Sequence, residues 1–399
     1  MEIEAARRRA REIFAAGLAA ADPFRATQLA MGDLARPGLI VAVGKAARAM
    51  AEAALSQFGG VPCIVVTNAG NDAPLAGARV HRAGHPVPDA QGARAAQDVL
   101  TGLRMAEGPV LALISGGGSA MLPAPVPPIT LAEKARLNEL LLAGGLDIRA
   151  MNCVRQQISS LKGGGFLRAA APQKVTALIL SDVVGDDLSV IASGPTVAPV
   201  GTAEEAAAIL RDAGLWEEVP GSIRDRLLRD APPAAVPEAE NRLIGSNGHS
   251  VAAMAAFAGD AAVLPALEGD VADAARRVCD AAGGGVTIWG GETTVRLRGD
   301  GRGGRNQELA LRIAIEARRR GWTDFVCLQG GSDGRDGPTD AAGGLVDGGT
   351  LERIAAAGHD VEKLLENNDS CRALEAAGDL LMTGATGTNV ADLGVMIRP

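Results

Sequence analysis

A run of three glycines between two serines is the segment of this 399-residue sequence whose residue types point most directly to chemistry. An apolar, strand-like stretch at residues 110–114 leads into Ser115, Gly116, Gly117, Gly118 and Ser119. Glycine adopts positive φ angles readily and lets backbone amides come close to a ligand. If a helix begins just after the glycines, its amides and its positive dipole end also attract an anion. We therefore expect this segment to bind a phosphate or carboxylate group, with a tight packing turn as the alternative.

A second strand-like stretch, residues 39–43, leads through Gly44 to Lys45 and then into a helical pattern. The dipole of a helix disfavours a lysine at its N-terminus, so the position of Lys45 needs another explanation. We expect its ammonium group to face a phosphate or carboxylate at the carboxyl edge of a sheet, with a solvated lysine as the alternative. The segment is not a P-loop, because Ala46 stands where that motif needs Ser or Thr.

Two further cations lie in residues 151–166, whose pattern predicts a helix. Arg155, Ser159 and Lys162 follow one another at the spacing of one helix face, and Gly163 resembles a cap at the C-terminal end. Cations near a helix C-terminus also occur for stability alone. The sequence therefore leaves two interpretations of Arg155 and Lys162 open, anion binding and helix stabilisation.

Carboxylates follow the next strand-like stretch, residues 175–181. Asp182 comes first and Asp186 follows after a short loop. A carboxylate at the end of a strand can hold Mg²⁺ whose other ligands come from substrate phosphates. Asp also caps helices and starts turns, which is the alternative interpretation. We expect Asp182 to bind the metal, and Ser193 and Thr196 in the following segment to contact a substrate or nucleotide.

The C-terminal half also places polar residues after strands and at helix starts. Glu292 follows an apolar stretch and is a weaker candidate metal ligand. Arg305 stands at a helix start, where its planar guanidinium suits bidentate binding of a carboxylate or a transferring phosphoryl group. Turn and capping chemistry is the alternative for each segment. The other candidate substrate- or nucleotide-binding residues in this half are Asn306, Asp333, Thr388 and Asn389.

Residues 299–304 spell G-x-G-x-x-G, the fingerprint of a dinucleotide site. The stretch before them alternates apolar and polar residues, unlike a buried parallel strand. The next strand-like stretch ends in Gln329 and two glycines rather than in an acid that would bind a ribose. This lone match therefore gives only weak support for a dinucleotide.

Short apolar stretches alternate with longer helical patterns through the N-terminal half. Continuous apolar strands are typical of a parallel sheet that helices cover on both faces, so we predict a doubly wound, Rossmann-like α/β domain. After a Pro- and Ala-rich linker at residues 231–240, one stretch alternates as in an antiparallel hairpin, so we predict a smaller, mixed α/β C-terminal domain. The predicted domains are residues 1–232 and 240–399; the predicted strands are residues 39–43, 63–67, 110–114, 175–181, 286–289, 293–298 and 325–329, and the predicted helices include residues 1–21, 46–55, 90–103, 131–142 and 306–320.

The composition is that of a globular protein, with 47% hydrophobic and 22% charged residues. A formal net charge of −8 argues against binding of a nucleic-acid backbone, and an aromatic content of 2% argues against base stacking. The five cysteines include no C-x-x-C pair, so we expect neither a disulfide framework nor a zinc site. No apolar run approaches the roughly 20 residues that cross a bilayer. We see no signal peptide, and we expect a cytoplasmic protein without a membrane partner.

Taken together, these motifs resemble the class II glycerate kinases, a family also named for its MOFRL C-terminal domain. The resemblance covers nearly the whole sequence and keeps the order of the motifs. It implies an active site in the cleft between the two domains, and phosphorylation of D-glycerate to 2-phosphoglycerate with ATP and Mg²⁺. Lys45 and Arg305 match positions that the family treats as catalytically important, and Ala385 stands where a Pro is common. The motifs that carry the resemblance are residues 44–45, 115–120, 181–187, 193–196, 290–293, 303–308, 332–340 and 387–392.

Two other functions stay open at this point. Members of this family have also been described as hydroxypyruvate reductases, an activity that would need NAD(P)H. A non-catalytic sensor of small anionic metabolites is the third hypothesis, although Lys45, Asp182 and Arg305 would exceed its needs. The expected partners are the small molecules glycerate and ATP, and a homodimer is one option. The sequence does not decide the oligomeric state, which domain holds ATP, or which residue is the general base.

Overall fold

The computed structural model describes residues 2–229 and 235–399, which form two compact units. Unit 1 consists of Met1–Asp22 and Gly245–Pro399, and unit 2 consists of Pro23–Ile244. The first helix therefore belongs with the C-terminal half, whereas the sequence places it in the N-terminal domain. Part of the predicted linker, including the predicted domain end at residue 232, lies outside the described residues.

Unit 2 is built on a six-stranded sheet with the order β3-β2-β1-β4-β5-β6. The pairs β1–β2, β2–β3, β1–β4 and β4–β5 are all parallel. This is the strand order of a Rossmann-type doubly wound sheet, so the predicted fold class of the N-terminal domain is confirmed. The strands are β1 (Leu39–Val43), β2 (Cys63–Thr67), β3 (Ala78–Arg82), β4 (Val110–Ser115), β5 (Val175–Leu180) and β6 (Ala239–Gly245).

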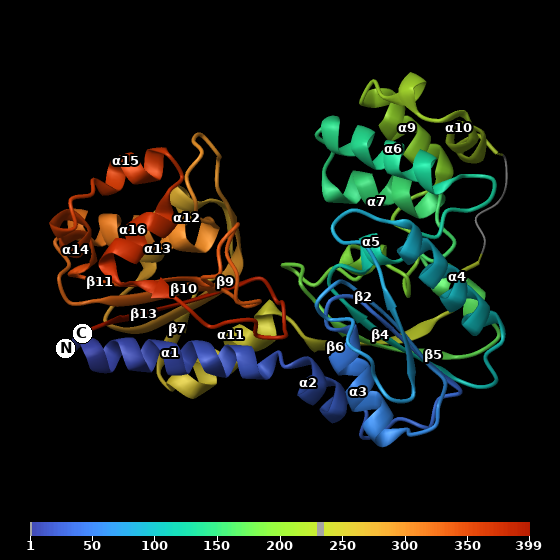
Figure 1. Ribbon diagram of the computed structural model, residues 1–399, viewed down its shortest axis with the longest axis horizontal. Helices are drawn as coiled ribbons and strands as arrows, with labels where there is room; N and C mark the ends of the chain where they lie inside the picture. Colours follow the sequence, from blue (N-terminus) through green and yellow to red (C-terminus); the bar gives the residue numbers. More distant parts are fainter. Residues whose placement is uncertain (1, 230–234) are drawn as a thin grey trace. The chain divides into compact units, whose positions relative to one another are not determined.

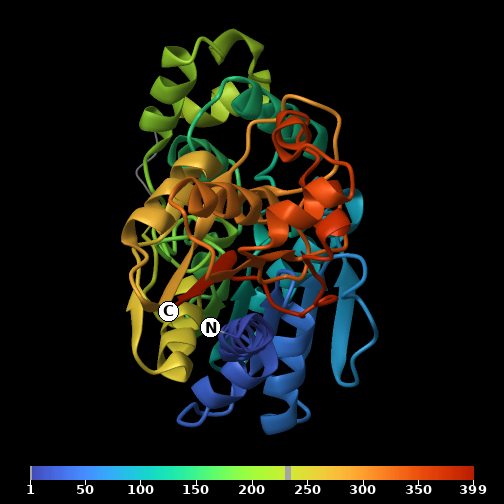
Figure 2. The same ribbon diagram turned by 90° about the vertical axis from the view of Figure 1, so that its left-hand side faces the viewer.

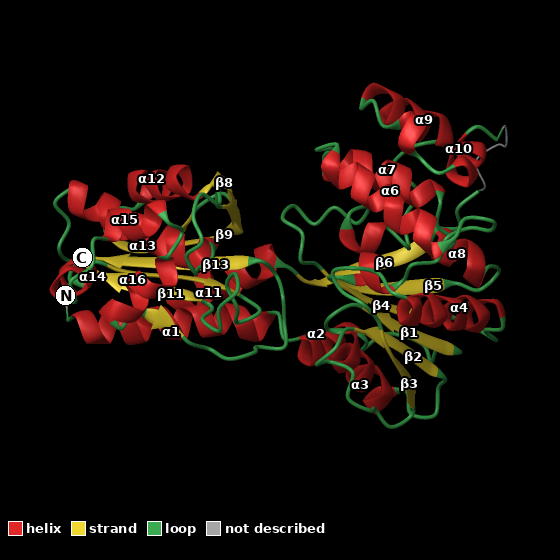
Figure 3. Cartoon of the chain, turned by 45° about the horizontal axis from the view of Figure 1, so that its top comes forward, coloured by secondary structure: helices red, strands yellow, loops and turns green. Residues whose placement is uncertain are grey.

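The helices of unit 2 form two groups (Figure 1, Figure 3). α3 and α4 pack on the sheet, whereas α6, α7, α9 and α10 enclose a hydrophobic core of their own around Leu137, Val154 and Leu210. α6 and α7 are inserted between β4 and β5, and α6 begins with a capping box of Thr130 and Glu133. The helices are α2 (Pro23–Ala30), α3 (Ala47–Gln57), α4 (Ala90–Arg104), α5 (Gly118–Met121), α6 (Leu131–Ala143), α7 (Ile148–Gln157), α8 (Gly165–Ala170), α9 (Ala203–Asp212) and α10 (Gly221–Leu227), with the 3-10 turns η1 (Ile191–Ser193) and η2 (Trp216–Glu218).

Unit 1 is built on a mixed sheet with the order β12-β11-β10-β13-β9-β7, and β8 also pairs with β9. β10 is antiparallel to β11 and β13, and β13 is antiparallel to β9, whereas β7 and β8 run parallel to β9. The predicted mixed α/β architecture of the C-terminal domain is therefore confirmed. The strands are β7 (Ala261–Val263), β8 (Leu267–Asp270), β9 (Gly285–Thr294), β10 (Val326–Gly331), β11 (Gly343–Asp347), β12 (Leu380–Leu381) and β13 (Asp392–Arg398).

One strand, β9, occupies the region where the sequence predicts two. Gly290 and Gly291, which separate the two predicted strands, pair with Leu393 and Asp392 of β13 and continue the ladder. After Thr294 the chain leaves the sheet, so the predicted strand over residues 293–298 is wrong beyond that point.

Two groups of helices cover opposite faces of the unit 1 sheet (Figure 1, Figure 2). α1 and α11 share one core with the strands, which includes Phe14 and Met254. α12, α13 and α16 share the other, which includes Val278, Leu309 and Leu374. Because α1 fills one face of this sheet, the N-terminal residues belong to unit 1. The helices are α1 (Ile3–Ala20), α11 (Asn247–Ala258), α12 (Val271–Ala281), α13 (Arg305–Arg319), α14 (Thr350–Ala356), α15 (Val361–Glu366) and α16 (Ser370–Ala377). Within the described part of the chain, none of the helices has the length and apolar character of a membrane span.

Candidate active site

Lys45 and the glycine segment lie on either side of the point where the strand order of unit 2 reverses. β1 and β4 are neighbours in the middle of the sheet, and the chain proceeds from them in opposite directions. In doubly wound sheets, ligands bind at the carboxyl ends of the strands beside this point. Gly44 and Lys45 follow β1, and Ser115 ends β4, so the structure brings these predicted residues together.

Backbone and hydroxyl contacts hold the two loops against each other. The Lys45 amide donates to the Gly116 carbonyl oxygen at 2.9 Å, and the Ala46 amide donates to the Ser115 hydroxyl at 3.1 Å. Gly44 has a φ of 117°, and a Cβ there would overlap Ser115, so this turn requires glycine. Among the described residues, none forms a hydrogen bond or ion pair with the half-buried ammonium group of Lys45.

The turn after β4 is tighter than the sequence predicts. Gly117 adopts a φ of 84°, and α5 begins immediately after it but has only four residues. The short helix α5 contributes little dipole. Any anion here would therefore have to bind to the backbone amides of the glycine turn. The Asp182 carboxylate lies against Gly116, where an added Cβ would overlap it. The ends of β4 and β5 therefore place the predicted metal ligand beside the glycines.

His85 also faces this turn. A Cβ added at Gly117 would lie 3.2 Å from the Nε2 atom of His85. Partial burial and the positive charge of Lys45 hold the pKa of His85 below its ordinary value. The lowered pKa favours the neutral imidazole, which can accept a proton next to Lys45.

Ser193 stands at the centre of a buried polar cluster. Its Oγ lies 2.5 Å from the Ser119 Oγ, donates to the Asn152 Oδ1 at 3.1 Å and accepts from the Lys162 Nζ at 3.1 Å. Ala192 and Ser193 have φ angles of 51° and 61°. This conformation costs free energy for residues other than glycine and concentrates at functional sites. The structure therefore brings three predicted binding residues, Ser119, Lys162 and Ser193, into one cluster.

Lys162 reaches this cluster from a turn and not from the predicted helix face. α7 ends before Ser159, which forms a β-bridge with Pro125. The Ser159 hydroxyl accepts from the Lys162 amide at 3.3 Å, so it competes with the helix for that amide. The predicted helix spacing of Arg155, Ser159 and Lys162 is therefore wrong. Gly163 likewise lies in the turn that precedes α8 and does not cap α7.

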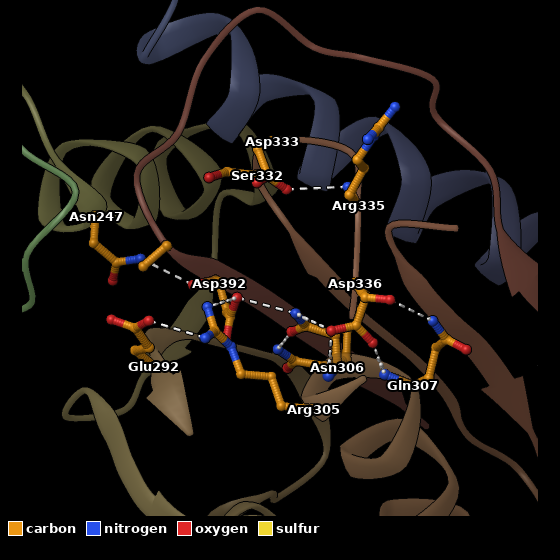
Figure 4. A network of polar contacts seen from close by, with 12 residues as sticks. Asn247, Glu292, Arg305, Asn306, Gln307, Ser332, Asp333, Arg335, Asp336 and Asp392 are labelled. Atoms are coloured by element: carbon orange, nitrogen blue, oxygen red, sulfur yellow. Dashed lines mark hydrogen bonds and ion pairs between the residues drawn. The ribbon is translucent and has the colours of Figure 1, made fainter. Parts of the chain in front are cut away.

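Arg305 is fully engaged by carboxylates of unit 1 (Figure 4). Its Nε and Nη2 atoms donate to Asp392 at 2.7 and 3.0 Å, and its Nη1 atom donates to Glu292 at 2.9 Å. Although burial opposes the charge, the hydrogen bonds and charge of Asp392 raise the pKa of Arg305. Glu292, the second predicted metal ligand, is thus an ion-pair partner of Arg305 in this structure.

A carboxylate of the same unit occupies the N-terminus of α13. Asp336 accepts from the amides of Asn306 at 3.1 Å and Gln307 at 2.8 Å. The Asn306 side chain donates to Asp336 and Asp392 and accepts from Gln329. Burial raises the pKa of Asp336 to about 6 against the effect of these bonds. Asp336 therefore fills the helix start that an external anion would otherwise occupy.

The remaining predicted binding residues each form a hydrogen bond within their own unit. The bonds join Thr196 to Asn241, Thr388 to Ala21, Asp333 to Arg335 and Asn389 to Ala391. Those of Thr196 and Thr388 are both 2.6 Å long and tie separate segments together. A role of these four residues in ligand binding stays a prediction.

The residues present fit a magnesium ion held mainly by a substrate. In the described parts of the chain, no group of three or more His, Cys, Asp or Glu side chains could hold a metal ion. Mg²⁺ usually takes one or two carboxylates and completes its shell with waters and phosphate oxygens. Asp182, at the end of β5 beside the glycine turn, has the position that such a site requires.

In the segment that spells G-x-G-x-x-G, residues 299–304, the backbone amides of residues 299–302 are engaged. The amides of Arg298 and Gly299 donate to Asn368, and the Arg302 amide donates to Asp369. A dinucleotide fingerprint needs its backbone open to a pyrophosphate. These glycines instead fit the turn at residues 367–370.

Four residues of these sites carry no clear signal in the sequence: His85, Asn152, Asp336 and Asp392. Asp336 and Asp392 lie in segments of the resemblance, and the arginine nearby could have suggested an ion pair. Asn152 lies within residues 151–166, but its spacing there marks no role, and His85 belongs to no motif. Only the fold brings His85 to the glycine turn and Asn152 to Ser193.

Comparison with known proteins places both units in one family. Residues 9–228 match the model described as "Domain of unknown function (DUF4147)", and residues 285–392 match the model of the MOFRL family. A D-glycerate 2-kinase of Thermotoga maritima is 38% identical, with 89% of each chain covered. A protein of Agrobacterium vitis, provisionally named a hydroxypyruvate reductase, is 39% identical over 98% of this chain and 94% of its own length.

A solved structure agrees with these relatives. The crystal structure of a glycerate kinase from Thermotoga maritima superposes with a TM-score of 0.93 at 37% identity, and covers 99% of this chain and 100% of that chain. The sequence and fold matches thus extend over both units. The chain belongs to the MOFRL family of class II glycerate kinases.

Proposed function

We propose that this protein transfers a phosphoryl group from ATP to D-glycerate and forms 2-phosphoglycerate. Family membership and the D-glycerate 2-kinase of Thermotoga maritima support this proposal. The structural observation that carries it is the meeting of Lys45, the glycine turn and Asp182 at the reversal point of a parallel sheet. Phosphoryl transfer asks a protein mainly for positioning and for neutralisation of charge, which these residues supply.

The roles follow from the surroundings of each residue. Bound ATP supplies the phosphoryl group, and Mg²⁺ offsets part of its charge. The Lys45 ammonium, which no described residue pairs with, faces the reacting anions. Gly117 lets the backbone come close to them, and Asp182 holds the metal.

His85 is our candidate for the general base. The reacting hydroxyl of glycerate loses a proton during the transfer, and a neutral imidazole beside Lys45 can accept it. Because the pKa of His85 is lowered, kcat should decline only as the pH falls below the ordinary range of histidine. His85→Asn should lower kcat and remove this decline, and an unchanged pH profile would exclude His85 as the base.

Arg305 remains the second residue on which we expect activity to depend. Asp392 fixes the orientation of the guanidinium through two hydrogen bonds. The Nη1 atom is paired with Glu292, whose side chain is 46% exposed. A substrate anion can therefore reach Arg305 by exchange with Glu292. The expectation that residues of both units act on one substrate stays a prediction.

A hydroxypyruvate reductase, as the Agrobacterium vitis relative is named, is the alternative. Such an enzyme needs a nicotinamide cofactor. The fingerprint at residues 299–304 does not support one, because Asn368 and Asp369 accept from the amides of Gly299 and Arg302. We therefore favour the kinase.

A spectrophotometric comparison with the purified full chain separates the two activities. We expect ADP to form from ATP and Mg²⁺ only when D-glycerate is present, and NAD(P)H to persist with hydroxypyruvate. Oxidation of NAD(P)H without glycerate-dependent ADP formation would show that the protein is a reductase.

A further inference from the structure

The helical layer of unit 2 buries cations that the proposed function has not used. Lys134 on α6 and Lys162 after α7 are 2% and 3% exposed, and Arg155 on α7 is partly buried. Moving a charge out of water is costly, so buried charges in proteins are normally paired. Three cations in one buried region therefore need a partner.

The three cations lie close together. The Arg155 Nε donates to the Asn138 Oδ1 at 2.9 Å, and this bond joins α7 to α6 one helical turn after Lys134. Burial and the charge of Arg155 lower the pKa of Lys134 to about 8. Burial and the charges of both neighbours hold the pKa of Lys162 well below its ordinary range. Each cation thus disfavours the charge of the next.

The described residues offer these cations no carboxylate. Lys162 donates to the Ser119 carbonyl oxygen at 2.9 Å and to the Ser193 hydroxyl at 3.1 Å, and both acceptors are neutral. The Lys134 ammonium and the two terminal nitrogens of Arg155 form no hydrogen bond or ion pair with any described residue.

A fourth donor in this region is also unused. Asn152 is 1% exposed, and its Nδ2 atom is buried without a hydrogen-bond partner among the described residues. The Oδ1 atom of the same side chain accepts from Ser193, which fixes the amide next to Lys162. A buried donor without a partner costs free energy, because it has lost its hydrogen bonds to water. Like the three cations, this group can only donate a hydrogen bond.

We propose that Lys134, Arg155, Lys162 and the Asn152 side-chain amide form a binding site for a phosphoryl group. Such a ligand only accepts hydrogen bonds and carries more than one negative charge, which matches a set of donors with three cations. The site adjoins Ser119 and Ser193, directly after the glycine turn. We identify the phosphoryl group as part of a nucleotide, which rests on the proposed function. The phosphates of the nucleotide would then bind to unit 2.

Inorganic pyrophosphate tests the site without turnover. Isothermal titration of the full chain should show binding, and Lys134→Met, which keeps the side-chain length but removes the charge, should weaken it about tenfold or more. Lys174→Met is the matched control, because Lys174 is an exposed lysine of unit 2 outside the group. Its affinity should stay within about twofold of wild type, since exposed charges are screened.

A second variant keeps the test decisive if Lys134→Met does not fold. Asn152→Asp retains the oxygen that accepts from Ser193 and adds a carboxylate inside the group. This internal anion should raise the Tm of the unliganded protein and weaken pyrophosphate binding. Absence of pyrophosphate binding to wild type, or wild-type affinity in both variants, would overturn the proposal.

D-glycerate, titrated alone, distinguishes a carboxylate from a phosphoryl ligand. If Lys134→Met weakens binding of glycerate but not of pyrophosphate, the site takes a carboxylate and the phosphoryl assignment is wrong. If both variants lose pyrophosphate binding but wild type forms no ADP with glycerate, the phosphoryl site stands and the proposed function fails.

Discussion

Units 1 and 2 both gather charged residues at a candidate site, but they compensate the charges differently. In unit 1, Arg305 donates three hydrogen bonds to Asp392 and Glu292, and Asp336 fills the start of α13 (Figure 4). In unit 2, Lys134 pairs with no described residue, and the partners of Lys162 are neutral. The anions of unit 1 are thus built into the chain, whereas we propose that those of unit 2 come from a bound ligand.

This difference assigns different tasks to the two regions. Arg305, whose charge is paired with carboxylates, is already held in one orientation. Its contribution to activity should therefore depend on the geometry of the guanidinium. Uncompensated buried cations cost folding free energy, and proteins accept such a cost mainly at functional sites. We therefore expect loss of charge to matter most in unit 2 and loss of shape to matter most at Arg305.

The largest effect is expected from Lys45, whose ammonium group pairs with no described residue. Lys45→Ala should lower kcat/KM for glycerate phosphorylation about 100- to 1000-fold, because a cation that faces the reacting anions is lost. Lys174→Ala removes an exposed lysine of the same unit and is the control in the same steady-state assay. Near-native turnover of Lys45→Ala would remove Lys45 from the site.

Arg305→Lys tests the site of unit 1, because it changes the shape of the side chain and keeps its charge. The charge is kept, but the fork that donates from Nε and Nη2 to Asp392 is lost. We expect a loss of kcat of about tenfold or more, since lysine cannot replace a bidentate arginine. Wild-type kinetics in this variant would mean that charge, and not orientation, is what Arg305 supplies.

The glycine turn has a matched control in its own unit. Gly117 and Gly70 have φ angles of 84° and 89°, but an added Cβ meets His85 and Met121 only at Gly117. Both alanine variants should lose a similar free energy of unfolding, about 1–2 kcal/mol, from the left-handed backbone. Only Gly117→Ala should also lose activity, roughly tenfold or more, because the turn moves. Equal activity in the two variants would mean that the glycine segment is only a structural turn and does not bind a ligand.

The metal prediction concerns a smaller effect. Asp182→Asn should raise the Mg²⁺ concentration for half-maximal rate about tenfold, because one charged ligand is lost. Asp187→Asn should leave it unchanged, since the exposed Asp187 accepts from the amide and hydroxyl of Ser189. The same Mg²⁺ dependence in wild type and Asp182→Asn would exclude Asp182 as the ligand.

The smallest effect is a pH dependence of stability. The pKa of Lys134 is lowered to about 8 in the folded protein from an ordinary 10.5, so the cost of its buried charge is fully present below pH 8. Above pH 8 the unfolded chain binds more protons than the folded one, and the free energy of unfolding should rise with pH until about 10.5. Between pH 7.5 and 9 we expect a rise of about 1 kcal/mol that Lys134→Met lacks, measured by urea unfolding without ligand.

The sequence predicts the sheet of unit 2 better than that of unit 1. β1 and β2 coincide with their predicted ranges, because continuous apolar runs mark strands that are buried on both faces. β11 and β13 were not predicted, since Gly343, Gly344 and Gly394 interrupt their apolar pattern. The sequence also cannot show that α1 fills a face of a sheet formed more than two hundred residues later.

The candidate site also contains residues that the sequence predicts and residues that it does not. The location of Lys45 and Asp182 could be predicted, because the carboxyl ends of parallel strands meet at one edge of a sheet. Lys134 could not, because a single lysine in an amphipathic helix predicts a solvated side chain and only the tertiary packing buries it. Arg155 and Lys162 were predicted as binding residues on a helix face that the structure does not form.

A phosphorus NMR spectrum of the product tests the central claim most directly. Wild-type protein is incubated with ATP, Mg²⁺ and D-glycerate, and the new phosphate monoester is observed with proton coupling. We predict a doublet, because an ester at carbon 2 has a single neighbouring hydrogen, and we predict that Lys45→Ala forms almost none of it. A triplet from an ester at carbon 3, or release of inorganic phosphate alone, would contradict the account.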